Sequence, residues 1–576
     1  MNPQMRLKMR ISLFLILSAM SLLSVLPGVL AGSGTIPLLA VRMEDGITSG
    51  SKADLTLEIA PGSGRVFVDT FPLSRVDTQM SMRLAKEIAC DTLNKDCRDL
   101  DFIYTLRADS PIVGGPSAGA AAAVLTVATL SSYRLPQDIA MTGTINSGGL
   151  VGPVGGLKEK IEAAKAAGIQ MVLVPRGEYV VNASNATLED YAEDLGVELR
   201  TVDSIQDALQ IMLPGRFRQE KEEIRIDSSY RETMKGLAES LCNRTASLRR
   251  SFGSLNVSSA LNFSAKAEEH FRKGQYYAAA SNCFGANVRF NEAFLKSKEF
   301  SPQKYGGLFS ELRAEIESFE KETEKKRILT ITDLESSMVI KERLLEAKES
   351  LDALNASTGA GNESPTENFA YAYAYANERL RSAYAWAEFL NHQGQPAELD
   401  RENLKATCEQ KIGEAEERIE YLAVTTPLPV GAAKETLQVA YLDLAEGSHA
   451  LCIFRASKAK AESNIILSAL GLTMEELPGV VDSKLEAAGR VISRAGRKGM
   501  FPILGYSYYE YAQTLATDDP ASALLYAEYS LEFSNLDMYF KQRPQPKLAF
   551  SGEEALILGV LLGFILGFVV NRLRKR

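Results

Sequence analysis

The stretch from Gly114 to Gly168 constrains the fold more than any other part of this 576-residue chain. It contains GGPSAGAAAAVLTVATL and, after a short interval, MTGTINSGGLVGPVGGLKEKIEAAKAAG. Pro116 favours a helix start, and the small residues after it predict a helix with Ser117 at its mouth. A hydroxyl there faces unpaired backbone N–H groups and the positive end of the helix dipole, which favour a developing negative charge.

A second helix is expected to begin near Leu157 and to end at Gly168, a residue that favours helix termination. At about 100° per residue its apolar face consists of Leu157, Ile161, Ala164 and Ala167. Lys160 falls on this face, whereas Lys158 falls on the polar side together with Glu159, Glu162 and Lys165. Burial disfavours the charged form of a lysine and lowers its pKa by up to ~3–5 units, which makes it a usable general base near neutral pH.

The surrounding domain, expected at residues 35–215, has no histidine, because the chain's three histidines are His270, His392 and His449. A Ser-His-Asp triad within this domain is therefore excluded, and a Ser–Lys dyad is the nucleophile–base pair that remains. Ser117 would attack a carbonyl carbon and Lys160 would take the serine proton. Backbone N–H groups near Ser117 would hold the oxyanion.

The segments GPSAG, MTG and GPVGGLKEKIEAAKAAGI, in this order and spacing, resemble the proteolytic domain of the Lon proteases. The match is closest to the archaeal membrane-associated Lon-like group. The resemblance implies an α+β fold for residues 35–215, with Ser117 as nucleophile, Lys160 as base and Thr142 as a hydroxyl that orients the lysine. It assigns Gly115, Pro116 and Ala118 to the serine turn and oxyanion region. Gly114 departs from the pattern, because many Lon proteases have an acidic residue three positions before the serine.

Each of these features also has an ordinary structural interpretation. A Pro-Ser-Ala-Gly turn before an alanine-rich helix is often plain close packing, and a lysine on an apolar face often extends its ammonium to solvent. Their combination at this spacing, in a histidine-free domain, favours a peptidase.

Both ends of the chain predict membrane targeting. In residues 1–31, Arg6, Lys8 and Arg10 precede an apolar run that ends in Val-Leu-Ala, which is typical of a signal peptide, with an uncleaved anchor as the alternative. Residues 555–573 are expected to form a transmembrane helix after a linker at 541–554, with a basic cytoplasmic tail to residue 576. The bulk of the chain would then lie outside the cytoplasm. The glycines of the last helix repeat every four residues and permit self-association, in line with the rings that Lon domains form: Gly559, Gly563 and Gly567.

Two further patterns agree with an extracytoplasmic location. Seven Asn-x-Ser/Thr sites predict a glycoprotein: Asn182, Asn185, Asn243, Asn256, Asn262, Asn355 and Asn362. The six cysteines favour disulfides over buried free thiols, and Cys90 and Cys97 are close enough in sequence to close a local loop. The other four allow three pairings that the sequence does not separate: Cys242, Cys283, Cys408 and Cys452.

After a charged connection at 216–228, residues 229–540 have helical periodicity almost throughout. Residues 265–290 and 507–533 have the spacing of tetratricopeptide hairpins, and residues 358–368 predict an exposed loop. Two interpretations of this helical domain are open: a bundle that only packs on the protease, or a surface that presents or selects substrates.

No Gly-Lys dipeptide occurs, so there is no Walker A loop, and no HExxH or zinc-type Cys/His spacing is present. We therefore expect no nucleotide, metal or other cofactor, and the net charge of −9 gives no reason to expect nucleic acid binding. The sequence predicts a membrane-anchored, ATP-independent serine endopeptidase acting on unfolded proteins or peptides. The alternative is a membrane-tethered helical scaffold whose peptidase-like domain serves assembly or self-processing.

Overall fold

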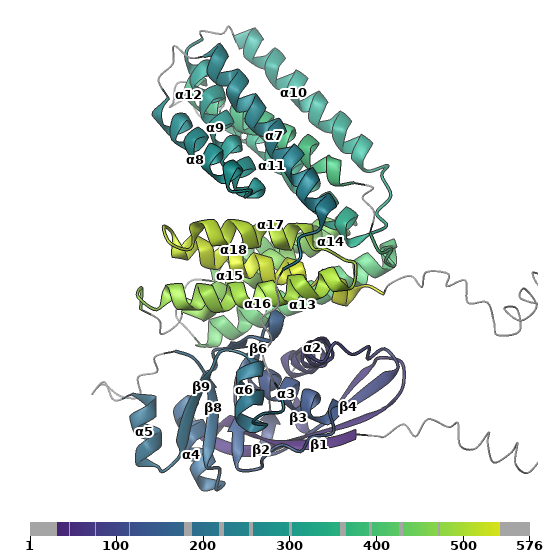
Figure 1. Cartoon of the computed structure of the whole chain (residues 1–576), viewed down its shortest axis with the longest axis vertical. Coiled ribbons are helices and arrows are strands. Elements are labelled where there is room, and N and C mark those ends of the chain that lie inside the picture. The colour runs from purple at the N-terminus through teal and green to yellow at the C-terminus, as the bar shows by residue number, and fades with distance from the viewer. Residues whose placement is uncertain are drawn as a thin grey trace, which may run out of the picture.

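The computed structural model describes residues 32–44, 47–74, 76–113, 116–177, 187–217, 224–252, 257–298, 302–357, 365–390, 394–425, 430–469 and 473–541. Figure 1 shows three tiers: an N-terminal domain (residues 32–217) below, the helices α13 to α18 in the middle and the helices α7 to α12 above. We call the two helical tiers together the helical region.

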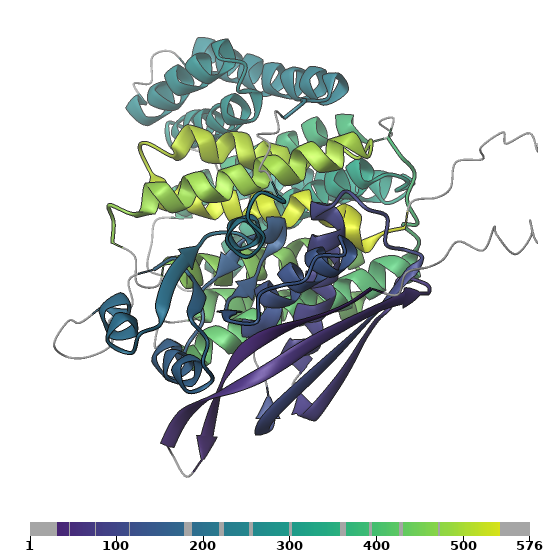
Figure 2. The same cartoon turned by 60° about the horizontal axis from the view of Figure 1, so that its bottom comes forward.

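The larger sheet of the N-terminal domain has four strands in the order β1-β2-β4-β3: β1 (Gly32–Glu44), β2 (Ile47–Pro61), β4 (Leu100–Val113) and β3 (Val66–Ser74). β1 and β4 are antiparallel to β2, and β3 is parallel to β4. The alternation in β2 explains its place, because Leu55, Leu57 and Ile59 are buried whereas Glu58 is exposed. Figure 2 shows this sheet at the lower edge of the molecule, away from the upper helices.

A second sheet carries the strands that lead into the candidate site. It has three parallel strands in the order β5-β8-β9: β5 (Ile139–Met141), β8 (Met171–Pro175) and β9 (Glu198–Val202). A short antiparallel hairpin follows β5, made of β6 (Thr144–Ile145) and β7 (Val151–Gly152) with the 3-10 turn η2 (Ser147–Gly149) between them. The expected combination of strands and helices in this domain is present.

The helices of the N-terminal domain pack on these sheets: α2 (Val76–Thr92), α3 (Gly119–Leu130), α4 (Leu157–Ala166), α5 (Leu188–Asp194) and α6 (Ile205–Met212). α3 is buried on all sides from Gly119 to Thr129, which its alanines permit because they leave room for close neighbours. α2, α3 and α6 share one core with the four-stranded sheet, and α4 and α5 share a second core with the parallel strands.

In the residues that the structure describes, the helical region consists of α-helices and short 3-10 turns joined by loops, with an isolated β-bridge between Thr330 and Pro396. Its upper tier contains α7 (Ser228–Ser251), α8 (Ser258–Arg272), α9 (Tyr276–Lys296), α10 (Pro302–Thr323), α11 (Ile331–Ser357) and α12 (Pro365–Trp386). Its middle tier contains α13 (Arg401–Thr425), α14 (Gly431–Glu446), α15 (His449–Ala469), α16 (Leu477–Arg497), α17 (Ile503–Leu515) and α18 (Pro520–Ser534). The 3-10 turns η3 (Ala387–Phe389) and η4 (Leu536–Tyr539) follow α12 and α18.

The two helical hairpins expected from the sequence are present, because α8 packs on α9 and α17 packs on α18. The tetratricopeptide likeness of the whole array stays a prediction. The loop expected at 358–368 is wrong in part, since α12 begins at Pro365, a residue well suited to the first turn of a helix.

All six cysteines form disulfides. Cys90–Cys97 closes the loop after α2, as expected. The two pairings that the sequence left open are Cys242–Cys283, which joins α7 to α9, and Cys408–Cys452, which joins α13 to α15.

The predicted signal segment, the linker after residue 541 and the predicted transmembrane helix at 555–573, with Gly559, Gly563 and Gly567, lie outside the described residues. In the part of the chain that the structure describes, no helix combines the length and the apolar character needed to cross a membrane.

Candidate active site

Ser117 lies in a 3-10 turn, η1 (Pro116–Ala118), that leads directly into α3. Pro116 is buried, and Ser117 itself is half-buried, so its hydroxyl is not sealed in the core. The serine therefore occupies the helix entrance that the sequence predicts, where the first N–H groups of a helix have no acceptor within it. Gly114 and Gly115 lie outside the described residues.

Gly143, which follows β5, is hydrogen-bonded to this turn and to the start of α3 through its N–H and its carbonyl group. Its N–H donates to the carbonyl oxygen of Ser117 at 2.9 Å, and its own carbonyl oxygen accepts from the N–H of Ala120 at 3.1 Å. Thr142 precedes Gly143 and is anchored from the other side, because its N–H donates to the carbonyl oxygen of Leu173 in β8 at 3.0 Å. Ser117 and Thr142 are thus fixed on neighbouring backbone segments.

Lys160 lies on the buried face of α4, with only 3% of its surface exposed. Its Nζ atom is 3.0 Å from Oγ1 of Thr142, and this hydrogen bond is buried. Lys158 is half-exposed, so only one lysine of the KEK segment is directed inward, as the helical periodicity predicts. Ala167 was wrongly predicted on the buried face: it is exposed, because it caps the helix beyond its last residue.

α4 reaches this position because it lies very close to β2. A Cβ atom on Gly50 would overlap the backbone carbonyl of Glu159 and approach Cβ of Ala163 to 2.9 Å. Only glycine leaves room for this approach of helix to strand. The role of Gly50 was missed in the sequence, because nothing local marks it as a contact of a helix more than a hundred residues away.

Burial lowers the pKa of Lys160 to about 7, and the nearby carboxylate of Glu159 opposes part of this shift. A lysine with this pKa is uncharged in a substantial fraction of molecules at neutral pH, so it has a lone pair that can accept a proton. Lys160 is therefore chemically able to accept a proton near neutral pH, and its amine donates a hydrogen bond to the Thr142 hydroxyl.

The structure brings together the residues around the Ser117 turn, the Thr142 segment and Lys160 on α4. In the described ranges no group of three or more His, Cys, Asp or Glu side chains is arranged to hold a metal ion. The arrangement supplies a hydroxyl at a helix entrance and a buried amine, which are the parts needed for nucleophilic attack with a lysine base.

Residues 109–215 match the family model of the Lon protease (S16) C-terminal proteolytic domain. Among similar proteins, the Lon protease of Paraburkholderia phytofirmans is 31% identical over 193 residues, which cover 32% of this chain and 22% of that protein. The Lon protease of Trichlorobacter lovleyi is 51% identical over 61 residues, 11% of this chain and 8% of that protein. The Lon protease of Methanosarcina barkeri is 29% identical over 163 residues, 27% of this chain and 20% of that protein. The chain thus spans about a fifth or less of the length of these relatives, and it carries a Lon-type proteolytic domain.

Proposed function

We propose that this chain, whose N-terminal domain is of the Lon proteolytic type, is an ATP-independent serine endopeptidase with Ser117 as nucleophile and Lys160 as general base. The observation that carries the proposal is the buried hydrogen bond between Lys160 and Thr142, within a segment that is itself bonded to the serine turn. Among the residues that the structure describes, no carboxylate forms an ion pair with Lys160. A buried lysine in this setting is costly to fold, and a catalytic role gives a reason for it.

In the proposed reaction, the Ser117 hydroxyl attacks the carbonyl carbon of the scissile peptide bond while the uncharged Lys160 amine takes its proton. The negative charge on the carbonyl oxygen is stabilised by backbone N–H groups at the helix entrance. Lys160 then gives the proton to the leaving amine, and an ester between the substrate and Ser117 remains. Water hydrolyses this ester, with Lys160 again accepting a proton.

We propose unfolded polypeptides as substrates and the extracytoplasmic side of a membrane as the location. The absence of a Walker A sequence leaves this chain without a nucleotide-driven unfolding motif of that type. The three disulfides support an oxidising compartment. Asn243 and Asn262 are exposed on α7 and α8, where glycosylation would meet no packing obstacle. Membrane anchoring and assembly into a ring rest on the sequence alone.

The test is cleavage of casein by the full chain in detergent, without ATP, beside Ser117→Ala. We expect fragments from the wild-type chain and none from the variant, with unchanged thermal melting. A well-folded wild-type chain that leaves casein intact but cuts itself would favour the alternative, a membrane-tethered scaffold with a self-processing domain. No cleavage of either kind would contradict a peptidase.

A further inference from the structure

The segment that joins Thr142 to Lys160 is held by the helical region. We call residues 143–156 the connecting segment; it contains the β6–β7 hairpin and ends where α4 begins. Its first residue, Gly143, is bonded to the serine turn, and β6 packs on η1 and α3. The position of this segment therefore fixes how the serine turn, Thr142 and Lys160 meet.

Three hydrogen bonds from the helical region reach the connecting segment. Nη2 of Arg418 on α13 donates to the carbonyl oxygen of Ile145 at 2.7 Å. The Ser147 hydroxyl donates to Oε1 of Glu532 on α18 at 3.1 Å. The Gly155 N–H donates to the hydroxyl of Tyr421 on α13 at 2.8 Å. The contacts thus lie at the start, the middle and the end of the segment.

Apolar packing supports the same contact. Gly148, at the tip of the hairpin, has a φ of +77°, and a Cβ atom there would lie 3.0 Å from Leu531 and 3.3 Å from Val491. Leu150 belongs to a small core with Ala487, Ala488, Val491 and Leu531 of α16 and α18. The hairpin tip therefore fits closely against the helical region.

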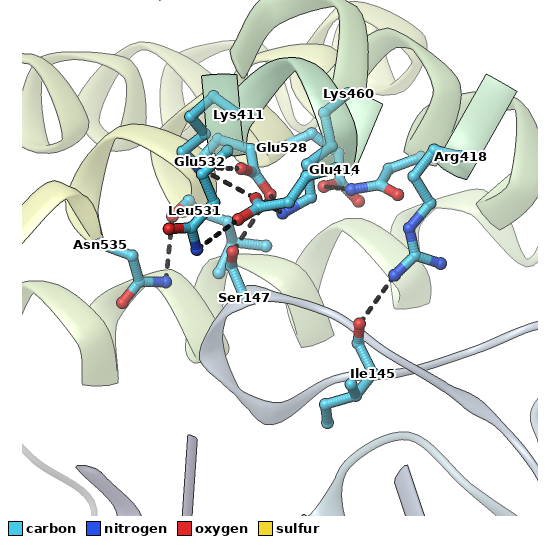
Figure 3. Close-up of polar contacts among 12 residues, drawn as sticks. Ile145, Ser147, Lys411, Glu414, Arg418, Lys460, Glu528, Leu531, Glu532 and Asn535 are labelled. Atoms are coloured by element: carbon cyan, nitrogen blue, oxygen red, sulfur yellow. Dashed lines mark hydrogen bonds and ion pairs between the residues drawn. The ribbon is translucent and has the colours of Figure 1, made fainter. Parts of the chain in front are cut away.

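Glu532 is held rigidly for its contact with Ser147. It is fully buried and lies 3.0 Å from the ammonium groups of both Lys411 and Lys460, which come from α13 and α15. Lys460 also pairs with Glu414 at 3.0 Å, so two lysines and two glutamates balance one another. Figure 3 shows this cluster directly above the hairpin, with Ser147 directed up to Glu532 and Arg418 directed down to Ile145.

We propose that Arg418 and Glu532 are positioning residues of the peptidase site, which hold the connecting segment so that Thr142 and Gly143 stay in register with the serine turn and α4. This inference rests on the proposed function. It assigns the helical region a part in catalysis, since the N-terminal domain alone lacks these two side chains. Misplacement of a catalytic group by ~1 Å can cost ~100-fold in rate, so a loosened segment should be visible in kcat.

Loosening would also change the surroundings of Lys160. A loosened segment would leave the Lys160 amine, now only 3% exposed, less completely shielded from water. Of the titratable groups described on α4 and on the elements packed on it (β1, β2, β8 and α5), only Glu159 contributes to the pKa of Lys160. Hydration should therefore raise this pKa.

The experiment compares Arg418→Met with Arg494→Met in the full chain in detergent. Arg494, on α16, pairs with Asp91 of α2 at 3.5 Å across the same boundary, and Asp91 keeps Lys498 as a second partner. Among the described residues, no hydrogen bond or ion pair joins Arg494 to the connecting segment. We expect Arg418→Met to lower kcat for an unstructured peptide at least ~10-fold at pH 7 with little change in KM. Raising the pH to 9 should restore much of the rate, and Arg494→Met should remain within twofold of wild type.

Arg418→Lys is the conservative variant. An ammonium group can still donate one hydrogen bond to the Ile145 carbonyl, so this variant should recover part of the lost kcat. A merely structural defect, a smaller fraction of folded protein, would not be reversed at pH 9. Equal kcat in wild type and Arg418→Met at pH 7, or equal losses in both methionine variants, would overturn the proposal while leaving the peptidase intact.

A second readout keeps the test independent of activity. If the wild-type chain neither cleaves peptide nor reacts at Ser117 with a fluorophosphonate, the proposed function fails. Amide hydrogen exchange over residues 145–152 then decides the inference. Faster exchange in Arg418→Met than in Arg494→Met supports positioning by Arg418, and equal exchange rejects it.

Discussion

The N-terminal domain and the helical region both bury lysines, but they treat the charge in opposite ways. Lys160 is buried beside a threonine hydroxyl, and burial lowers its pKa to about 7. Lys411 and Lys460 are buried as well, which alone would lower their pKa, but the carboxylates of Glu414 and Glu532 raise it above the usual value.

The difference teaches that the partner, rather than burial, decides what a buried lysine does. With carboxylates within 3.0–3.4 Å, a lysine keeps its proton and stabilises a fixed arrangement of helices. Without such a partner it exchanges its proton near neutral pH and is available as a base. The same side chain is thus a structural ion in one region and a candidate catalytic group in the other.

Replacing Lys160 should lower activity strongly without harming the fold. We expect Lys160→Met to lower kcat for peptide cleavage by ~10²–10⁴-fold, because the general base is lost. Melting temperature should stay the same or rise, since no buried amine remains. Lys158→Met, on the half-exposed side of the same helix, should keep wild-type activity. Comparable losses in both variants would remove the distinction between the two lysines.

The stability of the folded chain should rise with pH, because the pKa of Lys160 is lower in the folded chain than in the unfolded chain. Between about pH 7 and pH 10 the unfolded chain holds a proton on this lysine that the folded chain has lost, so stability rises with pH. Relative to Lys160→Met, wild-type stability should increase by about 1.4 kcal/mol per pH unit, or about 4 kcal/mol over that window. Urea unfolding of both proteins at pH 7 and pH 10 measures this. A difference that does not change with pH would contradict the account.

Removing one paired lysine should lower stability strongly, whereas replacing Lys160 should not. Lys411→Met leaves the buried cluster with an uncompensated carboxylate, which should cost about 3–5 kcal/mol in the free energy of unfolding. The double variant Lys411→Met/Glu414→Gln restores charge balance between Lys460 and Glu532 and should regain part of that loss. If the double variant is less stable than the single one, charge balance is not what holds this cluster together.

A smaller loss of stability is expected when Gly50, the glycine that lets α4 approach β2, is replaced. Gly50→Ala places a methyl group on the backbone of Glu159 and should cost about 1–3 kcal/mol while displacing Lys160. Gly236→Ala is the control, because Gly236 is an exposed position of α7 and a Cβ atom there would have no neighbour within 4 Å. This variant should be neutral or slightly stabilising. Unchanged stability and activity in Gly50→Ala would mean that α4 is not held by this contact.

Local patterns predicted the local parts of this site. The proline-serine turn, the alanine-rich helix and the inward direction of Lys160 follow from residue type and helical period, and the structure has all three. The alternation of apolar and polar residues in β2 likewise matches its buried face. These features depend on residues within a few turns of one another, where sequence spacing sets the geometry.

The parts of the site that could not be predicted from the sequence depend on contacts between residues that are far apart in the chain. Arg418 and Glu532 meet the hairpin across 273 and 385 residues, and no periodicity or motif marks such a pair. The buried charges of α13 and α18 were not predicted, because a balanced ion cluster has no sequence signature of its own. The pairings of Cys242 and Cys408 were open for the same reason.

The most direct test of the central claim is the pH profile of Ser117 modification by a fluorophosphonate, which reports the reactivity of the serine without substrate binding. In the wild-type chain the rate should rise about tenfold per pH unit below pH 7 and level off above it, as Lys160 loses its proton. In Lys160→Met the rate should be low and lack this transition. A rate that keeps rising to pH 10, or equal rates in the two proteins, would contradict a Ser117–Lys160 pair.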